Sequence, residues 1–179
     1  LRSGGDNYIQ FLLVGLTAWK WFASNIQQGS NAIEANVPIL RQVYVPKYIF
    51  LYSVVLTNTV KHLIVLILLI LFILISGYEV TNAWLALPVV MIFQLLFIIC
   101  VGGILSAIIP LIPDLKMLVD NILLFGLFIS GIFFDINSFS PSVQTYFKMN
   151  PMAVFIINYR KIFLDGEWPR DGDQRSSPP

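Results

Sequence analysis

The chain has 179 residues, of which 57% are hydrophobic and only 12% are charged, and its net charge is +1. A soluble domain of this size would carry about twice that share of charged residues, and a near-zero net charge without a long basic run gives no basis for nucleic-acid binding. The single cysteine, Cys100, and the single histidine, His62, exclude a disulfide framework and a zinc-finger type of metal site.

Long apolar runs occupy much of the chain. Residues 62–76 carry no charge after the histidine, and residues 84–109 carry none at all. A helix needs roughly 20 apolar residues to cross a hydrocarbon core of ~30 Å, and it pairs its backbone polar groups internally. We therefore predict an all-α integral membrane protein with about four transmembrane helices. The predicted spans are residues 8–26, 55–76, 84–109 and 117–134.

The first predicted span changes character along its length. Its first half is apolar, whereas its second half contains Trp19, Lys20, Trp21 and Phe22. A cluster of aromatic residues with a lysine is typical of a membrane interface, where the lysine stem lies along apolar surface and the ammonium reaches the headgroups. We expect this end of the span to lie near the headgroups.

The polar stretch 30–46 separates the first two apolar runs and is amphipathic. Glu34 follows Asn31 at the spacing of a capping box, which indicates the start of a helix. Pro38 interrupts the helical pattern and fits the first turn of a second short helix, residues 38–43, better than a helix interior. From the residues alone, this stretch is either an ordinary interfacial helix or a docking element.

The next apolar segment, residues 48–76, is too long for one upright span. Asn58, Lys61 and His62 lie in its first half. Either the span begins near Thr57, so that the lysine and the histidine lie close to the interface, or a longer tilted helix buries them. Charges inside a membrane are costly and often functional. Because Lys61 is close enough to an end to reach the headgroups, a structural role is favoured.

A very short turn, residues 77–81, makes the second and third predicted spans antiparallel neighbours. Small residues between positions 102 and 106 permit close helix contact near the end of the third span. Pro110 then ends that span, and Asp114 is placed to cap the fourth one.

The chain beyond Asp135 is polar and aromatic. A short apolar patch, residues 152–157, is not long enough to span a membrane, so we predict an outer re-entrant region over residues 140–164. Residues 170–179 have a composition typical of disorder. Residues 1–169 are thus predicted to form one transmembrane domain, followed by a short tail.

The motifs of several enzyme classes are missing from the sequence. It contains no Walker-type phosphate loop, no GxSxG, no HExxH and no CxxC. The histidine and four aspartates could act as bases, but they are scattered over both predicted faces of the membrane without a recurring spacing. These residues are His62, Asp114, Asp120, Asp135 and Asp165. We therefore predict that the chain is not an enzyme and assign no catalytic or metal-binding residue.

A series of short motifs follows along the chain in a specific order. They are Gly15 with Trp19 and Phe22, Val43-Tyr44-Val45-Pro46, Asp114-Leu115, Ser130-Gly131-Ile132-Phe133-Phe134, Asn150-Pro151-Met152-Ala153, Tyr159-Arg160, and Gly166 with Pro169. In this order and spacing, residues 8–169 resemble the permease subunit of the ABC-type polysaccharide and polyol-phosphate exporters. Members of that family export O-antigen, capsule or teichoic acid chains.

The resemblance implies a function, and also an orientation that the charge distribution leaves open. Residues 30–46 would be the cytoplasmic coupling element, which docks into a separate ATP-binding subunit. The expected contact residues are Glu34, Asn36, Arg41, Gln42, Tyr44 and Pro46. The chain would be a multi-pass protein of the bacterial cytoplasmic (inner) membrane that exports a lipid-linked glycan such as the O-antigen of lipopolysaccharide. It would act as a homodimer without a cofactor of its own, while ATP and Mg²⁺ bind the partner subunit.

The resemblance also implies where a glycan passes. Aromatic faces can stack on the apolar C–H faces of sugar rings, although the same side chains also serve as interface anchors. The expected substrate path on the cytoplasmic side is formed by Trp19, Trp21, Phe22 and Tyr52. The expected exit region contains Asn150, Pro151, Tyr159 and Arg160.

An intact member of this family is expected to have six spans, against the four predicted here, and the chain begins with Leu1 rather than methionine. We therefore expect a fragment that lacks the first and last spans. Two alternatives stay open. One is an ABC permease for small drugs or lipids, and the other is a non-ABC channel or scaffold in which Lys61 and His62 form the functional pair.

Overall fold

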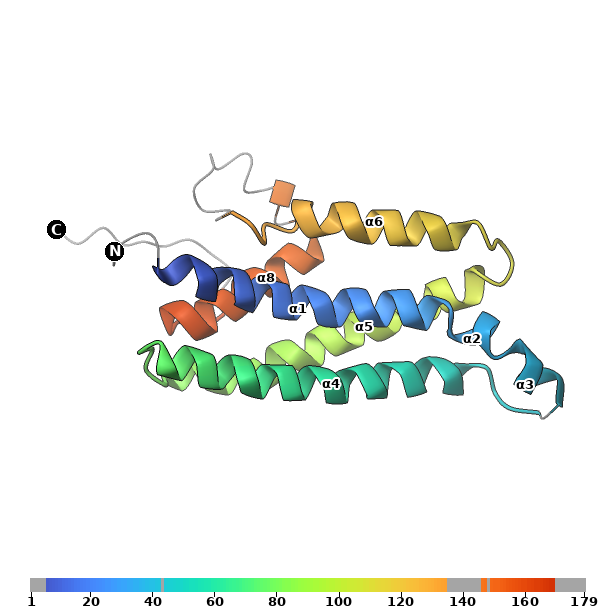
Figure 1. The fold of residues 1–179 in the computed structure, drawn as a ribbon, viewed down its shortest axis with the longest axis horizontal. Helices are drawn as coiled ribbons and strands as arrows, with labels where there is room; N and C mark the ends of the chain where they lie inside the picture. Colours follow the sequence, from blue (N-terminus) through green and yellow to red (C-terminus); the bar gives the residue numbers. More distant parts are fainter. Residues whose placement is uncertain (1–5, 43, 135–145, 148, 170–179) are drawn as a thin grey trace.

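The computed structural model describes residues 6–42, 44–134, 146–147 and 149–169. Every regular element in that part of the chain is a helix, and no strand occurs there (Figure 1). The helices are α1 (Asp6–Ser30), α2 (Ala32–Ala35), α3 (Val37–Gln42), α4 (Tyr48–Ile75), α5 (Leu87–Ile108), α6 (Leu115–Ile129) and α8 (Pro151–Arg160), with two short helical turns, η1 (Asn82–Ala86) and η3 (Lys161–Asp165). The predicted all-α class is confirmed.

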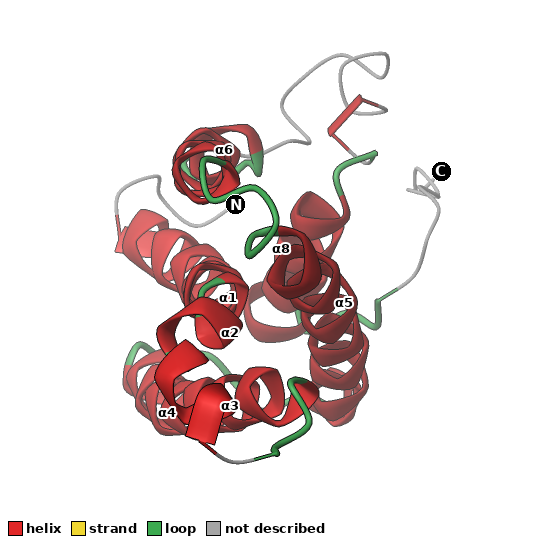
Figure 2. Ribbon diagram, turned by 90° about the vertical axis from the view of Figure 1, so that its right-hand side faces the viewer, coloured by secondary structure: helices red, strands yellow, loops and turns green. Residues whose placement is uncertain are grey.

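Helix α1 lies at the centre of the molecule. It packs against α4, α5, α6 and α8, and Figure 1 shows it between α4 on one side and α6 on the other. The α2–α3 segment lies at one end of the bundle, beyond the last turn of α1, whereas the turn between α4 and α5 lies at the opposite end. Figure 2 looks along the bundle and again shows α1 separating α6 from α4.

Helices α4 and α5 each bury one stripe of side chains and expose the rest. The buried residues of α4 recur every three or four positions and are Leu51, Val55, Asn58, His62, Leu66, Leu69 and Ile73. Those of α5 are Leu87, Val90, Gln94, Ile98, Gly102 and Ser106. The outer faces are apolar yet exposed, as at Leu68 and Ile92. An apolar outer face, together with a buried stripe that also holds polar residues such as His62 and Gln94, is typical of helices that contact lipid.

Two segments in the described part of the chain are long and apolar enough to cross a membrane. They are Tyr48–Ile75, with a mean hydropathy of 2.5, and Asn82–Ile108, with a mean hydropathy of 2.6. This criterion concerns length and composition alone. Helices α1 and α6, which the sequence also predicted as spans, are not among them, because α1 mixes apolar with polar residues and α6 has only 15 residues, about 22 Å of helix.

Two helix boundaries differ from the predicted ones. Helix α4 is continuous from Tyr48, so the longer of the two alternatives for this segment is observed. Helix α6 ends at Ile129 instead of continuing to residue 134. It stops because Gly131, two residues further on, has a φ of +71°, a left-handed conformation that is typical just beyond a helix end and is favourable only for glycine.

The stretch 30–46 contains two short helices as predicted, with Pro38 in the first turn of α3. The predicted capping box, however, is wrong. Asn31 precedes α2, but its side-chain amide donates a hydrogen bond of 2.7 Å to the carbonyl of Gln27 and does not cap α2. The last carbonyls of a helix have no hydrogen-bond partner within that helix. Asn31 therefore bonds to a free carbonyl at the end of α1 and is not available to cap the start of α2. Asp114 likewise precedes α6 without capping it.

The predicted antiparallel pairing of the two most apolar helices is confirmed. Gly77, with a φ of +86°, reverses the chain after α4, and α4 and α5 then pack side by side (Figure 1). The predicted tail, residues 170–179, and the first part of the predicted re-entrant region, residues 140–145, lie outside the described residues. The later part of that region forms α8 and η3.

Candidate functional site

The α2–α3 segment presents polar side chains at one end of the bundle. No residue of α3 is buried, and Tyr44, just beyond it, is 100% exposed. Asn36 is half-buried between the two short helices, and its amide donates to the carbonyl of Ala32 at 2.7 Å. The predicted contact residues with exposed side chains are Glu34, Arg41, Gln42, Tyr44 and Pro46. The segment is therefore available to a partner along most of its length.

The base of this segment is fixed to the bundle. Ala32 is buried, and α2 contacts α1, α4 and α5. Ser30, the last residue of α1, is also buried, and its hydroxyl donates to the carbonyl of Gln27 at 3.0 Å. The α2–α3 segment is therefore attached to three long helices at once.

Polar side chains of α1 and α4 meet inside the bundle. The ring of His62 stacks on that of Trp21, with centroids 4.3 Å apart and planes inclined by 2°. One turn toward α2–α3, the amide of Asn58 donates to Oε1 of Gln28 at 3.2 Å. Interhelical hydrogen bonds of this kind hold membrane helices together, so this polar seam ties α1 to α4.

The two residues proposed as a functional pair do not face one another. His62 is buried against α1, whereas the neighbouring Lys61 is exposed on the outside of α4. A third polar residue, Gln94 of α5, is fully buried and donates to the carbonyl of Ala18 at 3.0 Å. These contacts give the buried polar residues a structural role in helix packing.

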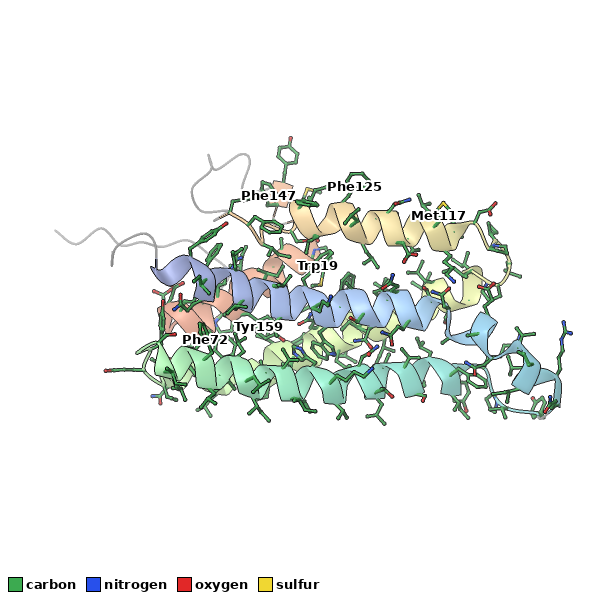
Figure 3. The ribbon with its side chains drawn as sticks, viewed as in Figure 1. Trp19, Phe72, Met117, Phe125, Phe147 and Tyr159 are labelled. Atoms are coloured by element: carbon green, nitrogen blue, oxygen red, sulfur yellow. The ribbon has the colours of Figure 1, made fainter. Side chains whose placement is uncertain are left out.

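An apolar pocket of about 320 Å³ lies between α1, α5, α6 and the start of α8. Phe22 stands at its wall, with its ring centroid 5.6 Å from those of Trp19 and Phe97. Figure 3 shows Trp19 reaching from α1 toward α6, where a Cβ at Gly126 would lie 2.7 Å from its ring. The lining residues are Trp19, Phe22, Ile26, Phe97, Val101, Leu105, Val119, Ile122, Leu123, Gly126, Asn150, Pro151 and Met152.

The structure gathers two of the four predicted path residues in this pocket. Trp19 and Phe22 line it, whereas Trp21 points to the other side of α1, against His62. Tyr52 is 51% exposed on α4, beside Tyr48. Sequence patterns did not identify Phe97 and Gly126 as pocket residues, since the only signal was a glycine within an apolar run.

The predicted exit residues lie at the two ends of α8, Asn150 and Pro151 at its start and Tyr159 and Arg160 at its end. Asn150 caps this helix, because its Oδ1 accepts from the backbone N–H of Met152 at 3.0 Å, and its amide donates to the hydroxyl of Ser130 at 3.3 Å. Pro151 follows in the first turn and is exposed. Tyr159 is buried at the other end of α8, and this burial raises the pKa of its phenol.

Arg160 ends α8 and is only 6% exposed. Its guanidinium donates to the carbonyls of Phe11 on α1 and of Gly131 and Ile132 beyond α6, and its Cζ lies 3.3 Å from the centre of the Phe11 ring. We call this arrangement the arginine clasp. Because these three acceptors are backbone carbonyls, no side-chain motif points to them. Within the described ranges, no three His, Cys, Asp or Glu side chains are grouped as a metal ion would require.

A comparison with known families identifies the class of protein. The family model described as "ABC-2 type transporter" matches residues 8–164, and the chain belongs to this family. It is therefore related to the permease subunits of membrane transporters, which are not enzymes in themselves and which normally work with an ATP-binding subunit.

Individual relatives carry a more specific name. The chain is 28% identical over 171 residues to the "O-antigen export system permease protein RfbA" of Myxococcus xanthus, covering 94% of this chain and 66% of the relative. It is 25% identical over 167 residues to the protein of the same name from Klebsiella pneumoniae, covering 93% of this chain and 64% of the relative. The chain thus spans slightly less than two thirds of the length of these curated relatives.

Proposed function

We propose that this chain is the membrane-spanning subunit of an ATP-driven exporter of lipid-linked polysaccharide, of the O-antigen kind. The observation that carries the proposal is the match to O-antigen export permeases over 93–94% of the chain. In this proposal the protein is a multi-pass component of the bacterial cytoplasmic (inner) membrane. Helices α1 and α6 cross the bilayer together with α4 and α5, and two copies of the permease line one channel.

The α2–α3 segment is the coupling element in this proposal. Most of its polar side chains are exposed, while its base is held by α1, α4 and α5. This arrangement suits a segment that binds a partner and transmits the partner's movement to the membrane helices. It docks into a separate subunit that binds and hydrolyses ATP with Mg²⁺. The contact residues are Glu34, Asn36, Arg41, Gln42, Tyr44 and Pro46.

The substrate passes from the cytoplasmic side, near the aromatic residues, to the outer end of the bundle. Trp19 and Phe22 contribute to the path through the pocket between α1, α5 and α6. Trp21 and Tyr52 are assigned to the same path, and Asn150, Pro151, Tyr159 and Arg160 to its exit. The pocket is almost entirely apolar, which suits the lipid anchor of a lipid-linked glycan.

An affinity purification tests the partner. The chain is extracted from its native membrane in mild detergent, and co-eluting proteins are identified by mass spectrometry. We expect a soluble ATP-binding subunit to co-elute. A permease recovered alone from native membranes, with its ends restored to the length of its relatives, would contradict the proposal.

A charge-reversal variant tests the coupling element. We expect Arg41→Glu to uncouple ATP hydrolysis from export while the fold is retained, because α3 buries none of its residues. The control is Lys116→Glu, which reverses an exposed charge on the same predicted face but outside α2–α3. Export of surface polysaccharide and ATP hydrolysis are measured for both variants. Normal export by Arg41→Glu would remove this role from α3.

A second candidate, an ABC permease for small apolar drugs or lipids, is favoured by the apolar lining of the pocket. ATP hydrolysis by the reconstituted complex separates the two. Stimulation by a purified lipid-linked glycan supports the proposed exporter, whereas stimulation by free lipids or apolar drugs alone supports the second candidate. The third alternative, a non-ABC channel, is excluded because the chain belongs to the ABC-2 family.

A further inference from the structure

The arginine clasp joins three parts of the chain that are far apart in sequence. Nε of Arg160 donates to the carbonyl of Phe11 at 3.2 Å, Nη1 to that of Gly131 at 2.8 Å, and Nη2 to that of Ile132 at 2.7 Å. Phe11 belongs to α1, Gly131 and Ile132 form the turn after α6, and Arg160 itself ends α8. One side chain thus fixes the relative positions of three elements.

The geometry of the clasp requires arginine. A guanidinium is a planar fork with five N–H donors in fixed directions, whereas the lysine ammonium is a compact point charge. The flat face of the Arg160 guanidinium also lies over the Phe11 ring, a favourable cation–π arrangement. Space for it exists because residue 15 is a glycine, where a Cβ would lie 2.7 Å from Nη2 of Arg160.

Helix α6 depends on few other attachments. Among its 15 residues, Val119 is the one that is buried. Near its start, Gln27 of α1 donates to Asp120 at 3.0 Å, but Gln27 is exposed and Asp120 only half-buried, and bonds near the surface contribute little. At its end, Ser130 accepts from Asn150 and the clasp holds the following turn. Tyr8 of α1 also donates to the carbonyl of Phe133, at an exposed site, and Trp19 packs against Gly126. Among these contacts, the clasp provides buried hydrogen bonds to the turn after α6.

Helix α1 is placed to carry movement to the clasp. It is one continuous helix of 25 residues, and at 1.5 Å per residue its Phe11 lies about 28 Å from Ser30 along the axis. At the Ser30 end it meets the α2–α3 segment, and at the Phe11 end it meets Arg160. Helix α1 is therefore a continuous connection between the α2–α3 segment and the clasp.

We infer that Arg160 is a positioning residue, which makes α1, the turn after α6 and α8 move as one body during transport. This inference rests on the proposed function, in which ATP-driven movement enters at α2–α3, and it assigns the residue that delivers the movement to the outer end. Arg160 was assigned above to the exit of the path, but this positioning role depends on its bonds to backbone carbonyls and not on contact with the substrate.

Two variants disturb the clasp in different ways. Arg160→Lys retains the charge but cannot donate to three carbonyls in one plane, and Gly15→Ala leaves Arg160 in place but pushes its guanidinium away. The matched control is Gly103→Ala on α5, where a Cβ would meet the Leu51 side chain at an ordinary 3.7 Å. Each variant is made in the full-length permease and purified together with its ATP-binding subunit.

The readout is the amount of lipid-linked glycan exported for each ATP hydrolysed, measured in proteoliposomes. We expect both clasp variants to lower this ratio about tenfold, which corresponds to about 1.4 kcal/mol of coupling free energy, while Gly103→Ala leaves it unchanged. Thermal unfolding and retention of the ATP-binding subunit report on the fold. An unchanged ratio in both clasp variants overturns the inference. If Arg160→Lys fails to assemble with the ATP-binding subunit, the ratio measured for Gly15→Ala tests the inference. If neither variant assembles, Arg160 serves folding only and the inference is overturned.

A second measurement does not depend on the substrate. Spin labels are placed at the exposed positions Ile9 and Ile129, in a chain whose exposed Cys100 is replaced by serine. We expect the distance between the labels to stay constant when ATP is added to the wild-type complex and to change in Gly15→Ala. A wild-type distance that changes with ATP overturns the inference. A constant wild-type distance with no export of glycan would instead count against the proposed function.

Discussion

His62 lies inside a long apolar helix, where a histidine would ordinarily suggest chemistry. Its ring instead lies flat against Trp21 of α1, and its neighbour Lys61 points away from it. An aromatic pair that joins two helices contributes through its contact area and its offset geometry, and ionisation is not required. At this position the shape of the ring is therefore the property that matters.

This interpretation predicts different effects for two substitutions. His62→Phe should retain the fold and the export activity, because phenylalanine can stack on Trp21 in the same way. His62→Ala should lower the free energy of unfolding by about 2 kcal/mol, since it removes the stacked ring and leaves a cavity. Thermal unfolding in detergent measures both. Loss of export in His62→Phe with an intact fold would restore a chemical role to this histidine, and Lys61→Ala is the exposed control.

Asn150 permits a second prediction at this scale. Its side chain caps α8 through the N–H of Met152 and also donates to Ser130. Asn150→Ala should cost about 1 kcal/mol for the lost cap, and Asn150→Asp, which keeps the accepting oxygen, should cost less. Hydrogen exchange of the amides in the first turn of α8 measures the difference. Equal exchange in both variants would mean that the cap contributes nothing.

At the scale of elements, the contact between α1 and α6 depends on a glycine. A Cβ at Gly126 would lie 2.7 Å from the ring of Trp19, and the ring is held between α6 and Phe22. Gly126→Ala should therefore destabilise the protein by about 1–3 kcal/mol through overpacking. Adding Trp19→Phe should restore stability, because the smaller ring makes room for the methyl group.

Thermal unfolding of the single and double variants tests this pairing, with Gly103→Ala as the control that meets only an ordinary contact. A double variant that is less stable than Gly126→Ala alone would show that Trp19 and α6 are not in the predicted contact. Such a result would also contradict the pocket between these helices, because Trp19 and Gly126 both line it.

The elements differ in how far the sequence predicts them. Helix α5 and the second half of α4 follow from their uncharged apolar runs, because long segments of this composition form helices with apolar outer faces. Composition does not predict where α6 ends or which helix the Asn31 side chain bonds to. Each of these depends on the conformation or hydrogen bonding of a single residue. Gly131 stops α6 before the apolar run ends, and α1 takes the side chain of Asn31 from α2.

The candidate sites show the same division. Exposure of the coupling residues follows from their polarity, whereas the pocket and the clasp depend on contacts between residues far apart in the sequence, such as Phe22 with Phe97 and Arg160 with Phe11. A sequence pattern can place Trp19, Trp21 and Phe22 on one helix. It cannot decide that Trp19 and Phe22 line a pocket while Trp21 turns to His62, because this depends on where α4 and α5 pack.

At the scale of the whole molecule, the proposed orientation places α2–α3 in the cytoplasm and the α4–α5 turn on the opposite face. Single cysteines at Glu34 and at Glu79, both exposed, report these two ends once Cys100 is replaced. We expect a membrane-impermeant maleimide to label position 79 in intact spheroplasts and position 34 only after the membrane is opened. Labelling of both positions from one side would contradict the four-span arrangement.

The central position of α1 has a consequence for how the protein is made. This helix leaves the ribosome before α4 and α5, although it is less apolar than either and its contacts inside the bundle are made by Asn58, His62 and Gln94 of those later helices. The α4–α5 hairpin contains the two segments of the described chain that are long and apolar enough to cross a membrane. We therefore expect α1 to settle only after the hairpin has been inserted, although α1 is synthesised before it.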